Sequence, residues 1–292
     1  MQKLLRQAQG KQKVIAIVGP TASGKSALGA YLAKKLSGEI ISADSRQVYR
    51  GMRIISRAEP GHMVGVIDPR RTYSAGQFAK DAGGVIRKIM IYHKIPIVVG
   101  GTGFYTEALL TTPLPQVPPN KKLRAQLAKK TQKQLLSILK KLDRKSAARV
   151  DPHNIVRVIR AIEIAKAIGK IPALTQETAY KVLWLGLLPP KNYERLLQKG
   201  VKERLTKGVA AEAKKLRAQL SNKQFLALGF EFQLLAQYID KNLSESEFTE
   251  ALVRGERQYA KRQMRWFHRN KNILWVKNKS EALRLARRFL SR

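Results

Sequence analysis

Residues 19–26 read Gly19-Pro20-Thr21-Ala22-Ser23-Gly24-Lys25-Ser26 and form a complete GxxxxGK[ST] pattern. An apolar run precedes them at Val14–Val18, and a helix-like segment follows from Ala27. In this strand-loop-helix context the glycines let backbone N–H groups turn inward around phosphate, and the helix N-terminus adds partial positive charge. Lys25 supplies a point charge, and the Ser26 hydroxyl is a ligand for Mg²⁺. The stretch therefore predicts a diphosphate or triphosphate site rather than an ordinary glycine-rich turn.

The charge of the chain is strongly unbalanced. Its 57 lysines and arginines outnumber 20 acidic residues, which gives a formal net charge of +37. Such a field attracts polyanions and destabilises the compact state by self-repulsion, so it favours nucleic acid as a partner. The basic residues are spread along the whole chain. A basic proteome or a high-salt habitat is the alternative explanation.

Several classes of protein are excluded by composition. The chain has no cysteine, which rules out disulfides, thiolate metal sites and cysteine nucleophiles. Its four histidines are far apart in the sequence and show no metal-ligand spacing. No apolar segment approaches the roughly 18 to 20 residues that span a bilayer. We therefore expect a cytoplasmic monomer with no membrane partner.

Short apolar runs alternate with helical patterns in the first third of the chain. The expected elements are strands at 14–18, 39–42 and 95–99, and helices at 27–36 and 75–92. This alternation predicts an α/β fold, a P-loop NTPase-like parallel sheet flanked by helices. Ligands of such sheets bind beyond the carboxyl ends of the strands. The phosphate loop, Asp44-Ser45 and Gly101-Thr102 should therefore meet in one crevice.

A change in the residue pattern indicates a second domain. Four prolines within residues 111–120 indicate a linker. The chain is helical in pattern and basic over 121–169, and strands resume at 182–188 and 273–276. A helical segment between the strands of one sheet indicates an inserted module. The expected domains are a P-loop core formed by residues 1–115 and 180–292, and an inserted basic helical module at residues 120–178.

Longer strings resemble the successive motifs of the tRNA dimethylallyltransferase family, also called the tRNA isopentenyltransferase or IPP transferase family. The strings are ADSRQVYRGM at 43–52, IPIVVGGTGFY at 95–105, DPHN at 151–154, RAIE at 160–163 and YAKRQMRWF at 259–267. They span nearly the whole chain. The resemblance implies transfer of a dimethylallyl group from dimethylallyl diphosphate to the N6 amine of the adenosine 3′ of the anticodon in tRNA. It also implies that the inserted module binds tRNA.

The chemistry of that transfer fits the polar residues of the expected crevice. An adenine amine is a poor nucleophile, and Asp44 is the expected acceptor of its proton. The loop amides, Lys25 and Mg²⁺ on Ser26 would neutralise the leaving pyrophosphate. Thr102 would donate to the bridging oxygen or to the base. Asp44, Thr102 and Lys25 are therefore the expected catalytic residues, with prenyl diphosphate in the loop and no ATP consumed.

Recognition of the tRNA requires the target base to leave the anticodon stack and enter a pocket. The residues expected to contact tRNA are Asp44, Ser45, Arg46, Gln47, Thr102, Arg124, Val156, Arg157, Val158, Ile159, Arg160, Lys261, Arg262 and Gln263. Arg157 and Arg160 share one helix face and could grip phosphates together, the alternative being a solvated basic face. Near the C-terminus, aromatic residues among arginines suit RNA, but the spacing of Leu252, Tyr259 and Phe267 favours the core face of the last helix.

The chain departs from the family's pattern at several positions. The family has Asp-Ile-Gly-Thr followed by a lysine where this chain has Arg53-Ile54-Ile55-Ser56-Arg57-Ala58, and an arginine where this chain has Gly200. Gly229-Phe230-Glu231 matches the family's Gly-Tyr and basic residue only loosely. These departures affect secondary phosphate and RNA contacts and leave the four polar residues of the expected site in place.

Three other functions share part of this evidence. A nucleotide or small-molecule kinase would use the same loop and sheet, with Asp44 as the base for a substrate hydroxyl. An adenylate prenyltransferase acting on free AMP would not need the basic helical module. A non-catalytic RNA-binding protein would explain the charge but not the retention of all the polar site residues together.

Overall fold

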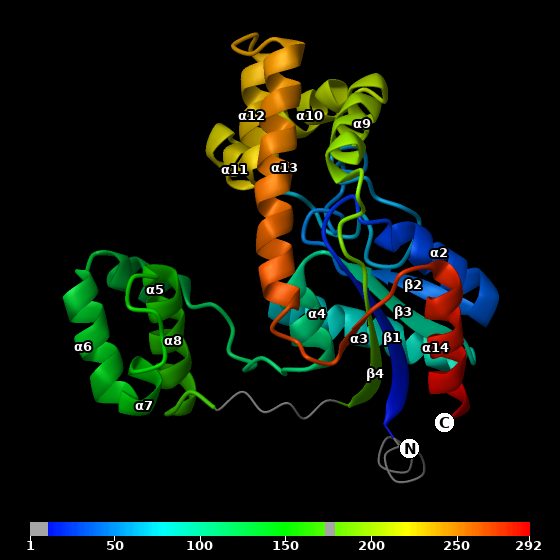
Figure 1. Cartoon of the computed structure of the whole chain (residues 1–292). Coiled ribbons are helices and arrows are strands. Elements are labelled where there is room, and N and C mark those ends of the chain that lie inside the picture. The colour runs from blue at the N-terminus through cyan, green and yellow to red at the C-terminus, as the bar shows by residue number, and fades with distance from the viewer. Residues whose placement is uncertain (1–10, 173–178) are drawn as a thin grey trace. The chain divides into compact units, whose positions relative to one another are not determined.

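The computed structural model of the protein describes residues 11–172 and 179–292 (Figure 1). The chain divides into two compact units, one comprising Met1–Thr111 with Thr178–Arg292, and the other comprising Thr112–Glu177. The first unit contains the sheet and the phosphate loop. The second is helical and interrupts the first in the sequence.

Five parallel strands form the sheet of the first unit. They are β1 (Gln12–Val18), β2 (Gly38–Ser42), β3 (Ile95–Gly100), β4 (Tyr180–Gly186) and β5 (Ile273–Trp275), in the spatial order β2-β3-β1-β4-β5. The predicted parallel α/β sheet is confirmed. The chain leaves β1 toward one edge and later returns to add β4 on its other side. The carboxyl end of β1 is therefore a topological switch point, where ligands of such sheets bind.

Helices cover both faces of this sheet (Figure 1). They are α2 (Lys25–Leu36) and α14 (Lys279–Ser291) on one face, and α3 (Ala75–Ile91) and α4 (Gly103–Leu110) on the other. Ile15 and Ile17 of β1 pack with Leu28 and Leu32 of α2 in one core cluster. Residues of a strand alternate between faces, so a strand covered on both sides must be apolar throughout. This explains why Val14–Val18 is an uninterrupted apolar run with no exposed residue.

The end of β4 differs from the sequence expectation. The strand was expected to reach Leu188, but it ends at Gly186. The Leu187 N–H still donates to the carbonyl of Val18, at 2.9 Å. Two prolines follow at 189 and 190, and proline has no N–H to donate to a neighbouring strand. The pairing therefore stops there, although the side chains remain apolar.

A cluster of helices follows β4. Its members are α9 (Tyr193–Thr206), α10 (Val209–Arg217), α11 (Asn222–Ala227), α12 (Phe230–Ile239) and α13 (Glu245–Phe267). Phe225, Phe232 and Phe248 are fully buried in their shared core. Helix α13 begins at a capping box formed by Ser244 and Glu247 and continues for 23 residues, about 35 Å. It packs against α9 and α12 near one end and against α4 near the other (Figure 1).

The second unit contains α5 (Lys121–Ala128), α6 (Gln132–Leu142), α7 (Arg144–Ala147) and α8 (Ile155–Ile168). Leu127, Leu135, Leu139 and Ile162 form its core. Each helix begins at a residue whose side chain accepts a hydrogen bond from the helix's own backbone, and Asn154 of the DPHN string does this for α8. Among the described residues, no helix is both long enough and apolar enough to cross a membrane.

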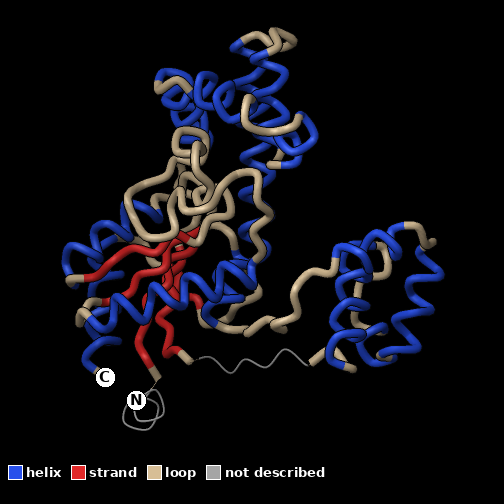
Figure 2. The backbone as a smooth tube through the Cα atoms, turned by 180° about the vertical axis from the view of Figure 1, so that it is seen from behind, coloured by secondary structure: helices blue, strands red, loops and turns tan. Residues whose placement is uncertain are grey.

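Loops gather beyond the carboxyl ends of the strands (Figure 2). The segment between β2 and α3 is the longest of those that join the described strands and helices of the first unit. It starts where β2 ends, and the Ala43 N–H donates to the carbonyl of Val99 on β3, at 2.8 Å. At this crossing Gly100 passes directly over the Ala43 backbone, because a Cβ atom added at Gly100 would lie 2.2 Å from the Ala43 carbonyl oxygen.

Gly100→Ala should therefore destabilise the protein. The added methyl group meets backbone atoms that cannot move without displacing the chain around Asp44, and overpacking of this kind costs about 1–3 kcal/mol or more. Gly84→Ala is the matched control, since the nearest atom to its added Cβ is the flexible end of Arg87, at 3.8 Å. In the middle of α3 that change should be neutral or stabilise by up to about 1 kcal/mol. Denaturant unfolding measures both, and equal stability of the two variants would contradict the close approach.

Candidate active site

The phosphate loop joins β1 to α2. Gly24, the residue before α2, has a φ of 89°, a left-handed conformation that glycine adopts without steric cost. The Ser23 N–H donates to the carbonyl of Pro20 at 3.3 Å and closes the turn. The loop therefore has the tight path that the sequence predicts, and it ends at the N-terminus of a 12-residue helix.

Lys25 is the first residue of α2 and lies folded back on the loop. Its Nζ donates to the carbonyl of Pro20 at 3.0 Å. The pKa of Lys25 is lowered from 10.5 to about 8, mainly by burial and in part by Arg57, against the opposing effects of Asp44 and Glu256. The ammonium group thus lies where positive charge is disfavoured until an anion arrives. A bound diphosphate would raise the pKa again.

A cavity of about 420 Å³ opens beside the loop. Lys25, Ser26 and Asp44 all line it, so the structure brings together the phosphate-binding and acid-base candidates of the sequence analysis. Ser42 and Val99 contribute from the ends of β2 and β3. The arrangement follows from the parallel sheet, because the carboxyl ends of neighbouring strands meet at one edge.

The carboxylate of Asp44 is held by the turn that follows it. Its Oδ1 accepts hydrogen bonds from the N–H groups of Arg46, at 2.8 Å, and Gln47, at 3.3 Å. Within the described chain, the hydrogen bonds to this carboxylate all use Oδ1. One oxygen is therefore fixed by the backbone, and within the described residues Oδ2 makes no hydrogen bond.

Thr102 ties this turn to the end of β3. Its Oγ1 accepts from the Ser45 N–H at 3.0 Å and lies 3.3 Å from the Ser45 hydroxyl. The hydroxyl of Tyr259, on α13, is also hydrogen-bonded to Thr102. Burial, with a further contribution from Asp44, raises the pKa of Tyr259 to about 12, so the phenol stays protonated. Leu252 and Phe267 are buried as expected, but Tyr259 lies at the site, because its position on α13 faces the turn at 44–47.

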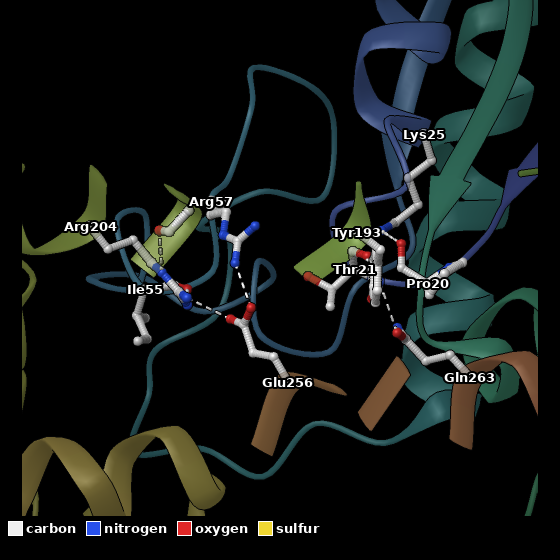
Figure 3. Close-up of polar contacts among 10 residues, drawn as sticks. Pro20, Thr21, Lys25, Ile55, Arg57, Tyr193, Arg204, Glu256 and Gln263 are labelled. Atoms are coloured by element: carbon white, nitrogen blue, oxygen red, sulfur yellow. Dashed lines mark hydrogen bonds and ion pairs between the residues drawn. The ribbon is translucent and has the colours of Figure 1, made fainter. Parts of the chain in front are cut away.

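Two glutamines expected to contact tRNA hold the polypeptide itself. Gln263 of α13 is buried, and its amide accepts from the Thr21 N–H at 2.9 Å (Figure 3). The same amide donates to the Gly101 carbonyl at 2.9 Å. Gln47 accepts from the Ser42 hydroxyl at 2.7 Å and donates to the Ser56 carbonyl at 3.1 Å. These amides position the loops around the site.

The candidates in the second unit divide into exposed and structural residues. Val156 and Arg157 of α8 are exposed. Val158 is fully buried in the core of the unit and has no surface to offer tRNA, since it lies on the inner face of α8. Ile159 is partly buried against the same core.

Arg124 and Arg160 both bond to one buried carboxylate, Glu163. Arg124 donates two hydrogen bonds to it, at 2.8 and 2.7 Å, and Arg160 donates one at 3.1 Å. Arg160 also donates to the Val117 carbonyl at 2.7 Å, which ties α8 to the linker. Burial opposes ionisation of Glu163, but these bonds and that of the Asn120 N–H outweigh it and lower the pKa to about 2. Both arginines therefore stabilise the fold of the unit.

Several residues of the site were missed by sequence reasoning. Tyr193 of α9 donates from its hydroxyl to the Thr21 carbonyl at 2.9 Å. Glu256 of α13 is buried between Arg57, at 2.7 Å, and Arg204, at 2.6 Å (Figure 3). One signal was available, because Glu256 and Gln263 lie two helical turns apart on a face that also carries apolar residues. A polar residue in an apolar helical stripe is a candidate for a buried bond.

Fold and site together define a P-loop α/β protein in which the loop lysine and serine share a cavity with a strand-end carboxylate. Sequence comparison gives the family: the family model described as IPP transferase matches residues 47–271. The chain belongs to the IPP transferase family.

Similar proteins agree with this assignment. A tRNA dimethylallyltransferase of Pelotomaculum thermopropionicum is 35% identical over 286 residues, covering 91% of each chain. One of Halalkalibacterium halodurans is 35% identical over 290 residues, again covering 91% of each. The crystal structure of the tRNA isopentenylpyrophosphate transferase of Bacillus halodurans has a TM-score of 0.69 and 30% identity, covering 97% of this chain and 96% of that one. A eukaryotic dimethylallyltransferase acting on tRNA has a TM-score of 0.76 and 28% identity, covering 87% and 69%.

The lowered pKa of Lys25 predicts a pH dependence for anion binding. Above pH 8 the folded protein must take up a proton at Lys25 to bind inorganic pyrophosphate, so wild-type affinity should fall by up to about tenfold per pH unit. Lys25→Arg stays charged across this range, and the ratio of the two affinities removes the titration of the ligand. Isothermal titration calorimetry from pH 7 to 9.5 measures both proteins.

The lowered pKa of Lys25 makes the free energy of unfolding rise with pH, whereas pyrophosphate affinity falls. Lys25 loses its proton near pH 8 in the folded protein but near 10.5 when unfolded. The unfolded chain therefore binds more protons between these values, and this group favours folding increasingly as the pH rises.

Parallel pH profiles for pyrophosphate affinity in wild type and Lys25→Arg would contradict the assignment of the lowered pKa to Lys25.

Proposed function

We propose that this chain transfers a dimethylallyl group from dimethylallyl diphosphate to the exocyclic N6 amine of the adenosine 3′ of the anticodon in tRNA. One observation carries the proposal: the phosphate loop, through Lys25 and Ser26, opens into the same cavity as Asp44. Prenyl transfer to an amine needs a cradle for the leaving diphosphate beside an acceptor for the amine proton. Membership of the IPP transferase family and the names of the relatives support the same activity.

In the proposed reaction the amine nitrogen attacks the first carbon of the dimethylallyl group. A C–N bond forms, and the C–O bond to the diphosphate breaks, its electron pair leaving with pyrophosphate. The Oδ2 atom of Asp44 accepts the proton that the amine loses. Its Oδ1 atom stays bonded to the N–H groups of Arg46 and Gln47. Because the backbone fixes Oδ1, the orientation of the free oxygen is set before the substrate binds.

The loop stabilises the charge that develops on pyrophosphate. Lys25 exchanges its bond to the Pro20 carbonyl for a phosphate oxygen, and the N–H groups of the loop donate to others. The donor chemistry also fits Mg²⁺, since the Ser26 hydroxyl is a hard oxygen ligand that lines the cavity. Mg²⁺ is commonly held by one or two protein oxygens together with substrate phosphates. It would add Lewis-acid stabilisation of the diphosphate.

Thr102 and Tyr259 position the turn that carries Asp44 and Ser45. The Thr102 hydroxyl already bonds to Ser45 and Tyr259. If this hydroxyl bonded to the substrate instead, the turn would lose these bonds and become less fixed. Arg46 lies beside Gly229, half-buried, and stays a candidate to read or stack on the extruded adenine.

The tRNA backbone would contact exposed basic residues of both units. Arg157 with Val156 on α8, and Lys261 with Arg262 on α13, are exposed. We also propose that the protein acts as a monomer in the cytoplasm, a compartment that a chain without cysteine fits. Neither a kinase nor a free AMP prenyltransferase is favoured by a specific contact of the site.

Asp44→Asn should lower the rate of dimethylallyl transfer about 10² to 10⁴-fold with little change in tRNA affinity. The amide keeps an oxygen for the N–H groups of Arg46 and Gln47 and loses the base. Asp68→Asn is the matched control, because Asp68 accepts from the N–H group two residues later, at 2.9 Å, in the same local geometry but outside the cavity. Single-turnover transfer of labelled dimethylallyl to tRNA measures both. Near-normal transfer by Asp44→Asn would eliminate this residue as the base.

Arg157→Ala and Arg160→Ala should separate RNA binding from stability. The first removes an exposed charge and should flatten the log-log salt dependence of tRNA affinity by roughly 1, with unfolding unchanged. The second takes a partner from buried Glu163 and should lower the stability of the second unit. Salt titrations of tRNA binding and thermal unfolding measure the two effects. An unchanged slope for Arg157→Ala would mean that this face is only solvated.

A further inference from the structure

Arg57 lies across Gly200. A Cβ atom added at Gly200 would lie 2.8 Å from both Cζ and Nη1 of Arg57, closer than real side chains approach. The guanidinium group of Arg57 therefore occupies the space that any side chain at position 200 would need. Gly200 and Ala58 are positions where this chain lacks a basic residue of the family's pattern. The structure brings Arg57 to one of them.

Glu256 holds this guanidinium in place. Arg57 donates from Nη2 to its Oε2 at 2.7 Å, and Arg204 lies 2.6 Å from its Oε1. Arg204 is almost fully buried and also bonds to the Gly200 and Ile55 carbonyls. Two guanidinium groups share one carboxylate, so the cluster carries a net positive charge. Arg57 is its exposed member, with 29% of the side chain accessible against 4% for Arg204.

The cluster faces the phosphate loop. Arg57 and Glu256 both act electrostatically on Lys25 and on Tyr193, whose hydroxyl bonds to the Thr21 carbonyl. Figure 3 shows Arg57 above Glu256, with Arg204 to its left and the loop residues Thr21 and Lys25 to its right. Among the described residues, the hydrogen bond that its side chain makes is the one to Glu256, from Nη2. Nε and Nη1 remain for an anion.

The backbone at Arg57 is strained. Its φ is 51°, in the left-handed region that residues with a side chain rarely adopt. Gln47 holds the turn in this conformation by donating to the Ser56 carbonyl at 3.1 Å. Strain of this kind persists where the surrounding structure imposes it, and it is concentrated at ligand sites.

We propose that Arg57 binds the diphosphate of the substrate, supplying from a different position of the chain the guanidinium that Gly200 lacks. The inference rests on the proposed function, because it assumes a diphosphate in the phosphate loop. Glu256 and the absence of a side chain at 200 position the group, and Lys25 binds the same anion from the other side.

Inorganic pyrophosphate binding, measured by isothermal titration calorimetry, tests this. Arg57→Gln keeps a donor for Glu256 and removes the charge, so it should weaken pyrophosphate binding about 10- to 100-fold, the value of a charge-assisted hydrogen bond. Arg57→Ala combined with Gly200→Arg moves the guanidinium to the other position and should recover most of that loss. Gly200→Arg alone should weaken binding and lower the melting temperature, because two side chains then compete for one space. Arg217→Ala is the control, since it removes an arginine from an exposed ion pair with Asp240.

The outcomes separate the two proposals. The proposed function itself would be overturned if the wild-type protein did not bind pyrophosphate, or if the Lys25→Ala variant bound pyrophosphate as tightly as wild type. If wild type binds through Lys25 but Arg57→Gln binds equally tightly, Arg57 serves only to neutralise Glu256 and the inference is wrong. A loss of affinity that the exchange variant does not recover, with a lowered melting temperature in both, would likewise assign Arg57 a purely structural role.

Discussion

The amide of Gln263 is the interaction on which the geometry of the site depends. It accepts from Thr21 in the phosphate loop and donates to Gly101 after β3, so one side chain sets the spacing between the loops that follow β1 and β3. The group is buried, and removing it would leave a backbone donor and acceptor without partners, which costs more than the bond itself contributes. Helix α13 delivers this amide, together with Tyr259 and Glu256. The phosphate loop is local in sequence. Its placement beside Asp44, however, depends on the bond from Thr21 to Gln263, which lies 242 residues further along the chain.

Both units use the same device to bury charge. Glu163 receives Arg124 and Arg160, and Glu256 receives Arg57 and Arg204. A single ion pair in the interior gains little over its desolvation cost, but leaving one buried partner alone is strongly unfavourable. In a chain with a net charge of +37, two arginines on one glutamate reduce local repulsion while keeping positive charge at the surface. Each cluster therefore stabilises its unit, and its more exposed arginine, Arg124 or Arg57, stays partly accessible to solvent.

The sequence was sufficient for features that depend on neighbouring residues. Strand β1 was predictable because a strand covered on both faces is continuously apolar, and the loop because its glycines, Lys25 and Ser26 act within eight residues. Asp44 followed from its place after β2. The end of β4 was missed because apolar residues continue past Gly186 while prolines remove the pairing donors. Tyr259 was assigned to the core because helical periodicity identifies the inward face and not whether a ligand site lies there.

The sequence by itself determined the phosphate cradle, the parallel sheet and the basic character of the chain, since each is set by local pattern or by composition. Only the tertiary structure decided which polar groups complete the site. Tyr193 reaches Thr21, Gln263 reaches Gly101, and Arg57 takes the space above Gly200, all across more than 140 residues. No periodicity links such pairs. They arise because α9 and α13 pack beside the carboxyl ends of the strands, where side chains from distant segments share one small volume.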